Sequence, residues 1–263
     1  MNVSLQGKHA LVLASSMGLG RAAAEALAAA GADLVITSSN QGRCEQVARS
    51  ISRSSGRRAV PIAADLFIPE SLGCLFAKAI DALGRIDILI INHPGPGLGL
   101  ARDVDLDVLD SHYRMMVSNP IRLIRCALEG MRSRGWGRIV SVGGRSMIEP
   151  LPNKVMDNIL RPAMVGYSKA LANEVAADGI TVNMILPGTF VTDRVHASTA
   201  SNAALWGISV EEAMRRRIES IPARRFGELR EFGAVVTFLC SEAASYVNGS
   251  VIRVDGSQTS SVY

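Results

Sequence analysis

Short apolar segments alternate with helix-like segments along the whole chain, and this alternation limits the possible folds more than any other feature. An apolar run over 9–13 precedes a helical stretch over 21–30, and the same order repeats over 33–37 and 43–52. Short buried strands separated by helices are typical of a parallel sheet that is covered on both faces. The sequence therefore predicts a doubly wound, Rossmann-type α/β domain with three layers. The remaining predicted strands lie at 59–63, 86–91, 138–142, 181–186 and 251–254, and the remaining helices around 70–83, 105–134, 157–178 and 228–240.

A single domain spanning 1–263 accounts for the whole pattern. The chain has 263 residues, of which 48% are apolar and 20% are charged, and no linker or low-complexity tract divides it. Only the segment 189–226 departs from the rhythm, with Ser/Thr/Ala-rich and Arg-rich sequence before the last helix. Ligands of open parallel sheets bind beyond the carboxyl ends of the strands, where a long insertion can close over them. We therefore expect 189–226 to form a lid or substrate insertion.

Composition argues against several classes of protein. No apolar run reaches the roughly 18 residues that a membrane span needs, and the run over 10–14 is too short for a secretory signal. The four cysteines are far apart with no C-x-x-C pair, so we expect neither a disulfide framework nor a metal site. We expect a cytoplasmic protein that binds neither a membrane nor nucleic acid.

The positive charges are dispersed except at three short arginine clusters. The net charge is +4, and arginines are adjacent at 57–58, 215–217 and 224–225. One interpretation is that these arginines form solvated faces. The other is that they attract a phosphate-bearing substrate such as an acyl carrier, because clustered guanidinium groups concentrate anions.

A glycine-containing turn follows the first predicted strand and leads directly into an alanine-rich helix. The turn reads Leu-Ala-Ser-Ser-Met-Gly-Leu-Gly over 13–20. Gly18 and Gly20 permit a tight turn and a close approach of the backbone, and the free amides at the start of a helix attract a pyrophosphate. This context predicts a dinucleotide site.

Four further signatures follow in order, and together with the turn they resemble the short-chain dehydrogenase/reductase family over nearly the whole chain. They are Ala-Asp-Leu at 64–66, the strand 86–92 ending in Asn92, the Pro-Gly of 187–188 with Thr192 beyond it, and the tail 246–256. Leu13 and Ala14 depart from the family's Thr-Gly, and His93-Pro94-Gly95-Pro96 departs from its Asn-Ala-Gly. The resemblance implies a homotetramer or homodimer built through the helices at 105–134 and 157–178. It also implies a nucleotide site that includes Ala14, Ser15, Ser16, Gly18, Leu19, Gly20, Ser38, Ser39, Asp65, Leu66, Asn92, Arg161, Pro187, Gly188, Thr189 and Thr192.

The residues after the second strand bear on which nicotinamide cofactor is bound. A carboxylate there would bind the ribose hydroxyls of NAD and repel the 2′-phosphate of NADP. The chain instead has Thr-Ser-Ser-Asn over 37–40, with Arg21 and Arg43 as sources of positive charge. This favours NADP over NAD.

The catalytic pair that the resemblance implies is missing. The family uses a tyrosine as general acid/base and a lysine four residues later, on one face of a helix. Residues four before the lysines at 8, 78, 154 and 169 are Ser4, Cys74, Pro150 and Val165, so no Tyr-x-x-x-Lys exists. Tyr167 precedes Lys169 by two residues, which places the two side chains on different sides of a helix.

The four catalytic positions of the family can still be located. Met116 falls at the relay asparagine, Gly144 at the serine, Asp157 at the tyrosine and Arg161 at the lysine. A shift of one register would bring in one of three other polar residues, namely Ser141, Asn158 or Asn119.

Five residues are candidates for the chemistry. Asp157 and Arg161 keep the i,i+4 spacing and can form an ion pair. An ionised aspartate in such a pair has no proton to give to a ketone. The alternative interpretation is that the two residues form a surface salt bridge with no role in the chemistry. Arg161 can still reach the cofactor ribose. His93 can exchange a proton near neutral pH or simply be a loop residue. Arg145 and Ser146 can point into the pocket, where an arginine polarises a carbonyl, or into solvent.

Three functions remain open. The first is an atypical NAD(P)-dependent oxidoreductase that acts on a carbonyl or hydroxyl of a small-molecule or acyl-carrier substrate. The second is a non-redox enzyme that uses Asp157 or His93 for proton abstraction or elimination. The third is a catalytically silent cofactor-binding protein or partner subunit.

Overall fold

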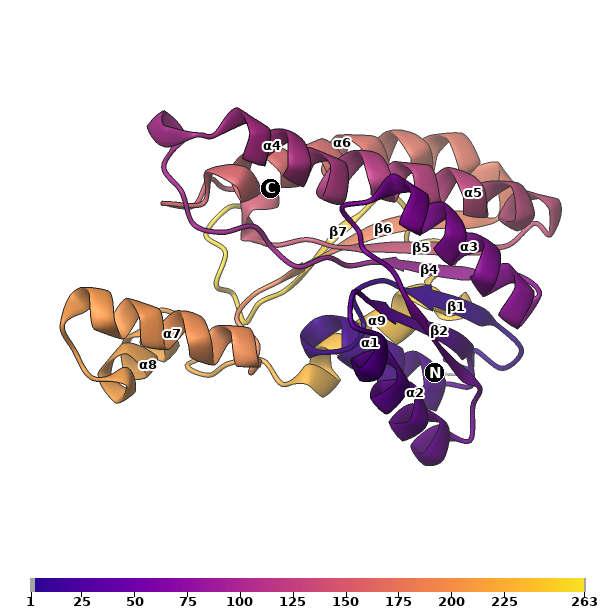
Figure 1. Ribbon diagram of the computed structural model, residues 1–263, viewed down its shortest axis with the longest axis horizontal. Helices are drawn as coiled ribbons and strands as arrows, with labels where there is room; N and C mark the ends of the chain where they lie inside the picture. Colours follow the sequence, from indigo (N-terminus) through magenta and orange to yellow (C-terminus); the bar gives the residue numbers. More distant parts are fainter. Residues whose placement is uncertain (1–2, 263) are drawn as a thin grey trace.

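A seven-stranded sheet runs through the centre of the computed structural model, which describes residues 3–262 (Figure 1). The strand order is β3-β2-β1-β4-β5-β6-β7, and every neighbouring pair is parallel. This confirms the predicted doubly wound Rossmann-type sheet. The strands are β1 His9–Val12, β2 Asp33–Ser38, β3 Ala59–Ala63, β4 Ile88–Ile91, β5 Gly137–Val142, β6 Ile180–Pro187 and β7 Val251–Val254.

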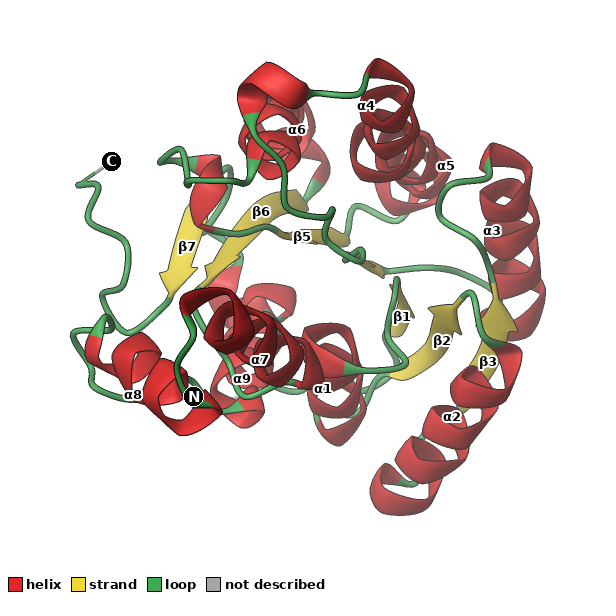
Figure 2. Ribbon diagram, turned by 60° about the vertical axis from the view of Figure 1, so that its left-hand side comes forward, coloured by secondary structure: helices red, strands yellow, loops and turns green. Residues whose placement is uncertain are grey.

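Helices cover both faces of the sheet (Figure 2). Helices α1, α2 and α9 pack on one face, whereas α3, α5 and α6 pack on the other, with α4 extending beyond the sheet. The helices are α1 Gly18–Ala29, α2 Gln41–Ser55, α3 Pro69–Leu83, α4 Leu106–Tyr113, α5 Asn119–Ser133, α6 Val155–Val175, α7 Asp193–Trp206, α8 Val210–Glu219 and α9 Leu229–Cys240.

Strand side chains alternate between two separate hydrophobic cores. Leu11 and Ile139 belong to the core beneath α3, α5 and α6. Their neighbours Val12 and Val140 belong to the core beneath α1, α2 and α9. Successive side chains of a strand point to opposite faces, so a strand buried on both sides must be apolar throughout. This explains why the strands read as continuous apolar runs.

The helical stretch predicted over 105–134 is confirmed over 106–133, although it is not regular α-helix throughout. It is divided into α4 and α5 by a wide turn of π-helix over Arg114–Ser118, in which the amide of Asn119 donates to the carbonyl of Arg114. Pro120 has no amide hydrogen for the carbonyl of Met116, so the regular i→i−4 ladder cannot continue through this point. The wide turn places Met116 at the edge of the candidate site, as is common for such turns.

The segment 189–226 holds two helices that the sequence pattern did not predict. Helices α7 and α8 pack against each other and project beyond the carboxyl ends of the strands (Figure 1). Arg217 on α8 joins them, because its Nη1 donates to the hydroxyls of Ser198 at 2.9 Å and Thr199 at 3.0 Å.

Within residues 3–262, none of the helices combines the length and the apolar character that crossing a lipid bilayer demands.

Candidate functional site

A small cavity lies where β4, β5 and β6 end, between the sheet and α6. Its lining includes His93 after β4, Ser141 on β5, Met116 in the π-helical turn and Arg161 on α6. The register of the sheet brings Ser141 beside Ile91 of β4. Ligands of open parallel sheets bind at the carboxyl ends of the strands, so this cavity is the candidate active site.

His93 lines the cavity with a defined tautomer. Its Nδ1 lies 3.0 Å from the carbonyl oxygen of Pro94. A carbonyl oxygen only accepts, so Nδ1 carries the hydrogen and Nε2 is left as an acceptor. Burial, with a further contribution from the positive charge of Arg161, lowers the pKa of His93 to about 4. The ring is therefore neutral at pH 7 and can accept a hydrogen bond or proton at Nε2.

Ser141 places an unpaired hydroxyl in the same cavity. Only 3% of the residue is exposed, and its Oγ has no hydrogen-bond partner among the described residues. A buried hydroxyl without a partner loses the hydrogen bonds that it makes in water. A bound molecule with a carbonyl or hydroxyl group would supply the missing partner. From the sequence, Ser141 was only one of three alternatives that a shift in register would bring in.

Asp157 and Arg161 form a buried ion pair rather than a surface salt bridge. The exposed fractions of the two side chains are 6% and 12%. The Arg161 guanidinium also fills the space beside Gly144, since a Cβ at Gly144 would lie 3.5 Å from Nε of Arg161. The interpretation of this pair as a solvated helical salt bridge is therefore wrong, because the packing of α6 against β5 encloses it.

Two of the three shifted-register residues have structural partners instead of facing the cavity. Asn119 donates from Nδ2 to the carbonyl of Leu66 at 2.9 Å. Asn158 is bonded through its amide to both the amide and the carbonyl of Leu151, at 2.9 Å each. Met116 lines the cavity at the position where the resemblance places a relay asparagine.

Arg145 does not point into the cavity, in contrast to the expectation from the sequence. Its guanidinium is paired with Glu149 at 2.6 Å, one helical turn later, and this partner draws it away from the strand ends. Ser146 is buried and does not line the cavity either. The sequence contained the explanation, because Glu149 stands four residues after Arg145.

A cradle for a pyrophosphate lies between β1 and α1. Gly18 has φ +54°, and a Cβ at Gly20 would overlap the carbonyl oxygen of Ala14 and the amide of Asn92. Asn92 donates from Nδ2 to that same carbonyl at 3.2 Å, which ties β4 to the turn. No side chain caps the first turn of α1, so its amides are open to an anion. The turn therefore fits a dinucleotide.

Ala14 adopts a backbone conformation that favours glycine. Its φ is +45°, in the left-handed region. The resemblance places the first glycine of the family's motif at this position. The turn thus keeps the geometry of the motif although the residue has changed.

Other residues assigned to the nucleotide differ in what their side chains can offer. Ser15 directs its hydroxyl to the carbonyl of Val12 at 2.7 Å, so only its backbone can face a ligand. Asp65 accepts from the amide of Phe67 at 2.9 Å, which shapes its own turn. Thr189 is bonded to Gln258 in the C-terminal tail through both its amide and its hydroxyl. Thr192 is the N-cap of α7 and lies near Gly18, where it can close the cradle.

The remaining nucleotide residues surround the cradle and the strand ends. Ser38 ends β2, and its hydroxyl binds the backbone of Asn40, whose side chain caps α2. No acidic side chain occurs over 37–40. The other assigned residues lie in the turn before α1, in the first turn of α1, after β2, after β3 and at the end of β6: Ser16, Leu19, Ser39, Leu66, Pro187 and Gly188.

Most arginines of the three clusters are paired within the protein. Arg57 pairs with Asp33 at 2.7 Å, Arg216 with Glu212 at 2.7 Å and Arg225 with Glu231 at 2.7 Å. This supports the interpretation of solvated faces for these three. Arg217 differs, because it is partly buried and holds the two lid helices together.

Two cations near the cavity carried no signal in the sequence. Lys154 is the residue before α6, and the neighbouring backbone bonds to Gly99 of the loop after β4. Arg194, in the first turn of α7, extends its guanidinium against Gly95 of the same loop. Neither residue belongs to a recognisable motif, and only the packing of that loop brings them together.

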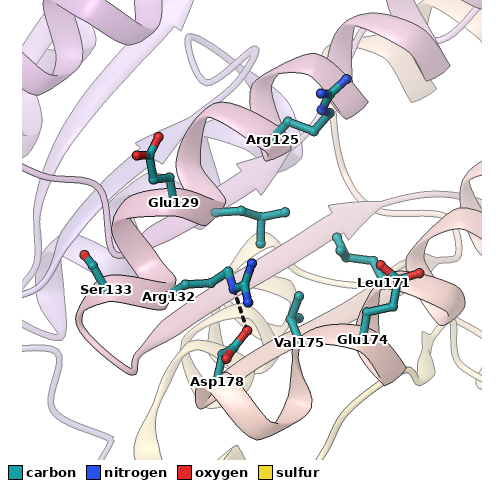
Figure 3. A pocket seen from close by; sticks show the side chains of 9 residues that line it. Arg125, Glu129, Arg132, Ser133, Leu171, Glu174, Val175 and Asp178 are labelled. Carbon is teal, nitrogen blue, oxygen red and sulfur yellow. Dashed lines mark hydrogen bonds and ion pairs between the residues drawn. The ribbon is translucent and has the colours of Figure 1, made fainter.

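A second, larger hollow lies far from the strand ends, between α5 and α6 (Figure 3). Charged side chains of both signs line it, including Arg125, Glu129 and Glu174, and Arg132 pairs with Asp178 at 2.7 Å. Two arginines stand against three carboxylates in this lining, and the hollow is open and shallow. Within residues 3–262 no three His, Cys, Asp or Glu side chains gather closely enough to hold a metal ion.

Comparison with known proteins gives consistent matches over the whole chain. A family model described as enoyl-(acyl carrier protein) reductase matches residues 13–259. The 3-oxoacyl-(acyl-carrier-protein) reductase FabG of Aquifex aeolicus is 32% identical over 261 residues, with 97% of this chain and 99% of that protein covered. The NADPH-dependent reductase BacG of Bacillus subtilis is 30% identical over 256 residues, with coverages of 97% and 99%.

A solved structure shows the same similarity in three dimensions. The L-sorbose reductase of Gluconobacter frateurii, in complex with NADPH and L-sorbose, superposes with a TM-score of 0.95 at 29% identity. The superposition covers 100% of both chains. The similarity therefore includes the strand ends, the cradle before α1 and the two lid helices.

Proposed function

The chain belongs to the short-chain dehydrogenase/reductase family, and from this premise we propose that it is an NAD(P)-dependent oxidoreductase with a non-standard active site. Its substrate carries a carbonyl or hydroxyl group. The observation that carries the proposal is one cavity lined both by His93, whose Nε2 is left as an acceptor, and by Ser141, whose hydroxyl has no partner among the described residues. Both lie at the carboxyl ends of adjacent strands, beside the residues that occupy the family's catalytic positions.

The nucleotide site fits NADP better than NAD. The cradle of Gly18, Gly20 and the open amides of α1 suits a pyrophosphate, and the absence of an acid after β2 leaves room for a 2′-phosphate. NADPH-dependent relatives support the same choice. When bound, the cofactor supplies or accepts a hydride. Arg161, held by Asp157, would contact its ribose at the position of the family's lysine.

The chain's own residues handle the proton and the substrate oxygen. Ser141 can donate its hydroxyl hydrogen to the oxygen on which negative charge develops. His93, neutral and fixed by Pro94, can take a proton from a substrate hydroxyl at Nε2 and return it in the reverse direction. Asp157 is committed to Arg161. This division assigns to Ser141 and His93 the work that the family's tyrosine performs.

Turnover with site variants tests the proposal. We expect the protein to oxidise NADPH with members of a carbonyl panel that includes ketoses, oxo acids and acyl thioesters. His93→Gln should lower kcat by about 10²-fold or more, the usual size of a general acid/base effect. Ser141→Ala should lower kcat by about 10²-fold, as for loss of one oxyanion donor. Neither change should alter the Kd for NADPH, and Arg145→Gln, which lies outside the cavity, should retain full activity.

Two results would contradict the proposal. Stoichiometric NADPH binding without oxidation over the whole panel would favour a silent cofactor-binding protein. Turnover of a substrate with no net change in NADPH, lost on His93→Gln or Asp157→Asn, would favour a non-redox enzyme on the same fold.

The quaternary structure and location form a separate proposal. We propose that the outer faces of α5 and α6, where the larger hollow lies, pack against a second copy to give a homodimer or homotetramer (Figure 3). Light scattering of the purified protein would measure the mass, and a monomer at micromolar concentration would reject it. We also propose a cytoplasmic location, since NADPH is supplied there.

A further inference from the structure

Two cationic side chains lie near residues that line the cavity: Arg194 is near His93, and Lys154 is near Arg161. Among residues 3–262, neither Lys154 nor Arg194 makes a hydrogen bond or ion pair through its side chain. Lys154 is partly buried, and the bridge between its backbone and Gly99 holds it at the start of α6. Arg194 extends from the lid and touches Gly95 in the loop after β4. They approach the cavity from two different elements.

The charges around Lys154 are unbalanced. It faces three arginines, namely Arg161 on α6, Arg194 on α7 and Arg217 on α8, whereas Asp157 is the acid that faces it. Asp157 is already paired with Arg161. Burial and these arginines lower the pKa of Lys154, and Asp157 offsets only part of the effect. An uncompensated cation is costly in a partly buried place, so the arrangement lacks an anion.

Ser141 is the second, independent sign of a missing ligand. It lines the cavity with a hydroxyl that is buried and has no partner. Its neighbours in the lining are mostly apolar, with Leu160 and Met184 among them. An oxygen atom inside the cavity would satisfy Ser141, and a negative charge beside Lys154 and Arg194 would satisfy the two cations. One molecule that carries both groups fits these needs.

We infer that the substrate carries a carboxylate, which Lys154 and Arg194 bind while its carbonyl or hydroxyl oxygen lies against Ser141 and His93. A carboxylate offers two acceptor oxygens to cations that come from different elements. The phosphates of the cofactor have their own donors at the start of α1. The positive charge near Lys154 is therefore left for the substrate.

The inference deepens the proposed function and rests on it for the reaction itself. In the direction of reduction, a hydride from NADPH adds to the carbonyl carbon of an oxo acid, and a proton adds to its oxygen. The products are a hydroxy acid and NADP⁺, while the carboxylate is unchanged. Binding of the carboxylate can be measured without this reaction, because an oxo acid cannot be reduced in the presence of NADP⁺.

The test is calorimetric titration of the protein saturated with NADP⁺. The probes are pyruvate, 3-oxobutyrate and 4-oxopentanoate, which differ in the distance between carbonyl and carboxylate, and the methyl ester of each. At least one acid should bind at least tenfold more tightly than its ester. Added NaCl should weaken the binding of that acid and leave the binding of its ester unchanged. Inorganic phosphate is a further probe.

Variants assign the effect to the two cations. Lys154→Gln and Arg194→Gln should each weaken binding of the acid about fivefold to tenfold and leave binding of its ester unchanged. Lys154→Arg should retain most of the affinity for the acid. Arg215→Gln removes one exposed charge from the same lid and should have no effect. The Kd for NADP⁺ is measured first for each variant, so that a change in cofactor binding is seen separately.

The outcomes separate this inference from the proposed function. Equal binding of every acid and its ester would overturn the inference, even if both kinds of probe are reduced by NADPH. The inference would also be overturned if the variants weaken only the binding of NADP⁺. It would be overturned as well if phosphate binds more tightly than all three acids. Tight and charge-dependent binding of an acid that NADPH fails to reduce would support the inference and count against the proposed function.

Discussion

Arg161 lies one helical turn after Asp157 on α6, and the two side chains form an ion pair with exposed fractions of only 12% and 6%. The resemblance in sequence places the family's lysine and tyrosine at these two positions. Spacing alone predicted the pair, but its burial depends on how α6 packs over β5. Each residue therefore needs the other for stability as well as for its position beside the cavity.

We predict that Asp157→Ala lowers the free energy of unfolding by about 3 kcal/mol, because it leaves a buried guanidinium unpaired. The pair Arg145–Glu149 has the same i,i+4 spacing but is more exposed, at 29% and 19%. Glu149→Ala should therefore cost about 1 kcal/mol or less. Urea unfolding of both variants measures the difference. Equal losses would mean that Arg161 finds water or another partner.

We predict that Gly20→Ala abolishes NADP⁺ binding, because its methyl group would overlap the carbonyl of Ala14 and the amide of Asn92. The turn must then open, and the amides of α1 lose their alignment. Gly73→Ala is the matched control, since it lies exposed in α3 with open space around it. That change should stabilise the protein by about 0.5 to 1 kcal/mol. Calorimetry measures the binding, and retention of normal affinity in Gly20→Ala would disprove the role of the turn.

We predict that Ala14→Gly stabilises the protein by about 0.5 to 1 kcal/mol. Relief of the left-handed strain at φ +45° outweighs the extra backbone entropy of glycine in the unfolded chain. Ala29→Gly, at an exposed right-handed position of α1, should instead destabilise by about 1 kcal/mol. Opposite signs in thermal unfolding would confirm the conformational cause, and destabilisation by both changes would refute it.

The sheet and the nucleotide turn could be predicted from the sequence because both depend on local patterns. The apolar runs fixed the strands, as at Ala59–Ala63 and Val251–Val254, where predicted and observed bounds agree. The turn with Gly18 and Gly20 depends on residues that are adjacent in the chain. Asn119 and Asn158 could not be assigned in this way, because their partners, Leu66 and Leu151, are set by packing between elements.

The reaction site was only partly predictable for the same reason. His93 could be identified because it lies two residues after the end of β4. Lys154 and Arg194 could not, because they meet only when the loop after β4 folds onto α6 and α7 approaches it. Ser141 could be distinguished from other serines only by its place in the lining of the cavity together with the absence of a partner. A missing partner is a property of the folded structure and leaves no pattern in the sequence.

We predict that Arg217→Gln loosens the lid without unfolding the sheet. The change removes the donors that join α8 to Ser198 and Thr199 of α7. Amide exchange in α8 should accelerate at least tenfold, while exchange in β5 stays unchanged, because local stability differs across a structure. Arg216→Gln loses only an exposed ion pair with Glu212, so the amides of α8 in this variant should exchange at the wild-type rate. Equal acceleration in both variants would show that Arg217 does not hold the lid.

We predict that His93 titrates near pH 4 in the free protein. Burial of the ring and the charges of Arg161 and Arg194 disfavour the imidazolium, and they outweigh Asp157 and the hydrogen bond to Pro94. An NMR titration of the ring measures the midpoint. The unfolded chain binds a proton at His93 below about pH 6.5, whereas the folded protein binds it only near pH 4. Protonation between these values therefore favours unfolding.

The free energy of unfolding should consequently fall as the pH falls from about 6.5 to about 4, and this contribution should be absent in His93→Gln. Comparison of the two proteins across this window isolates His93 from the carboxylates that titrate in both. A bound oxo acid adds negative charge opposite Arg194, which should move the midpoint of His93 towards neutral pH in the NADP⁺ complex. A midpoint that stays near pH 4 with the acid bound would place the carboxylate away from His93.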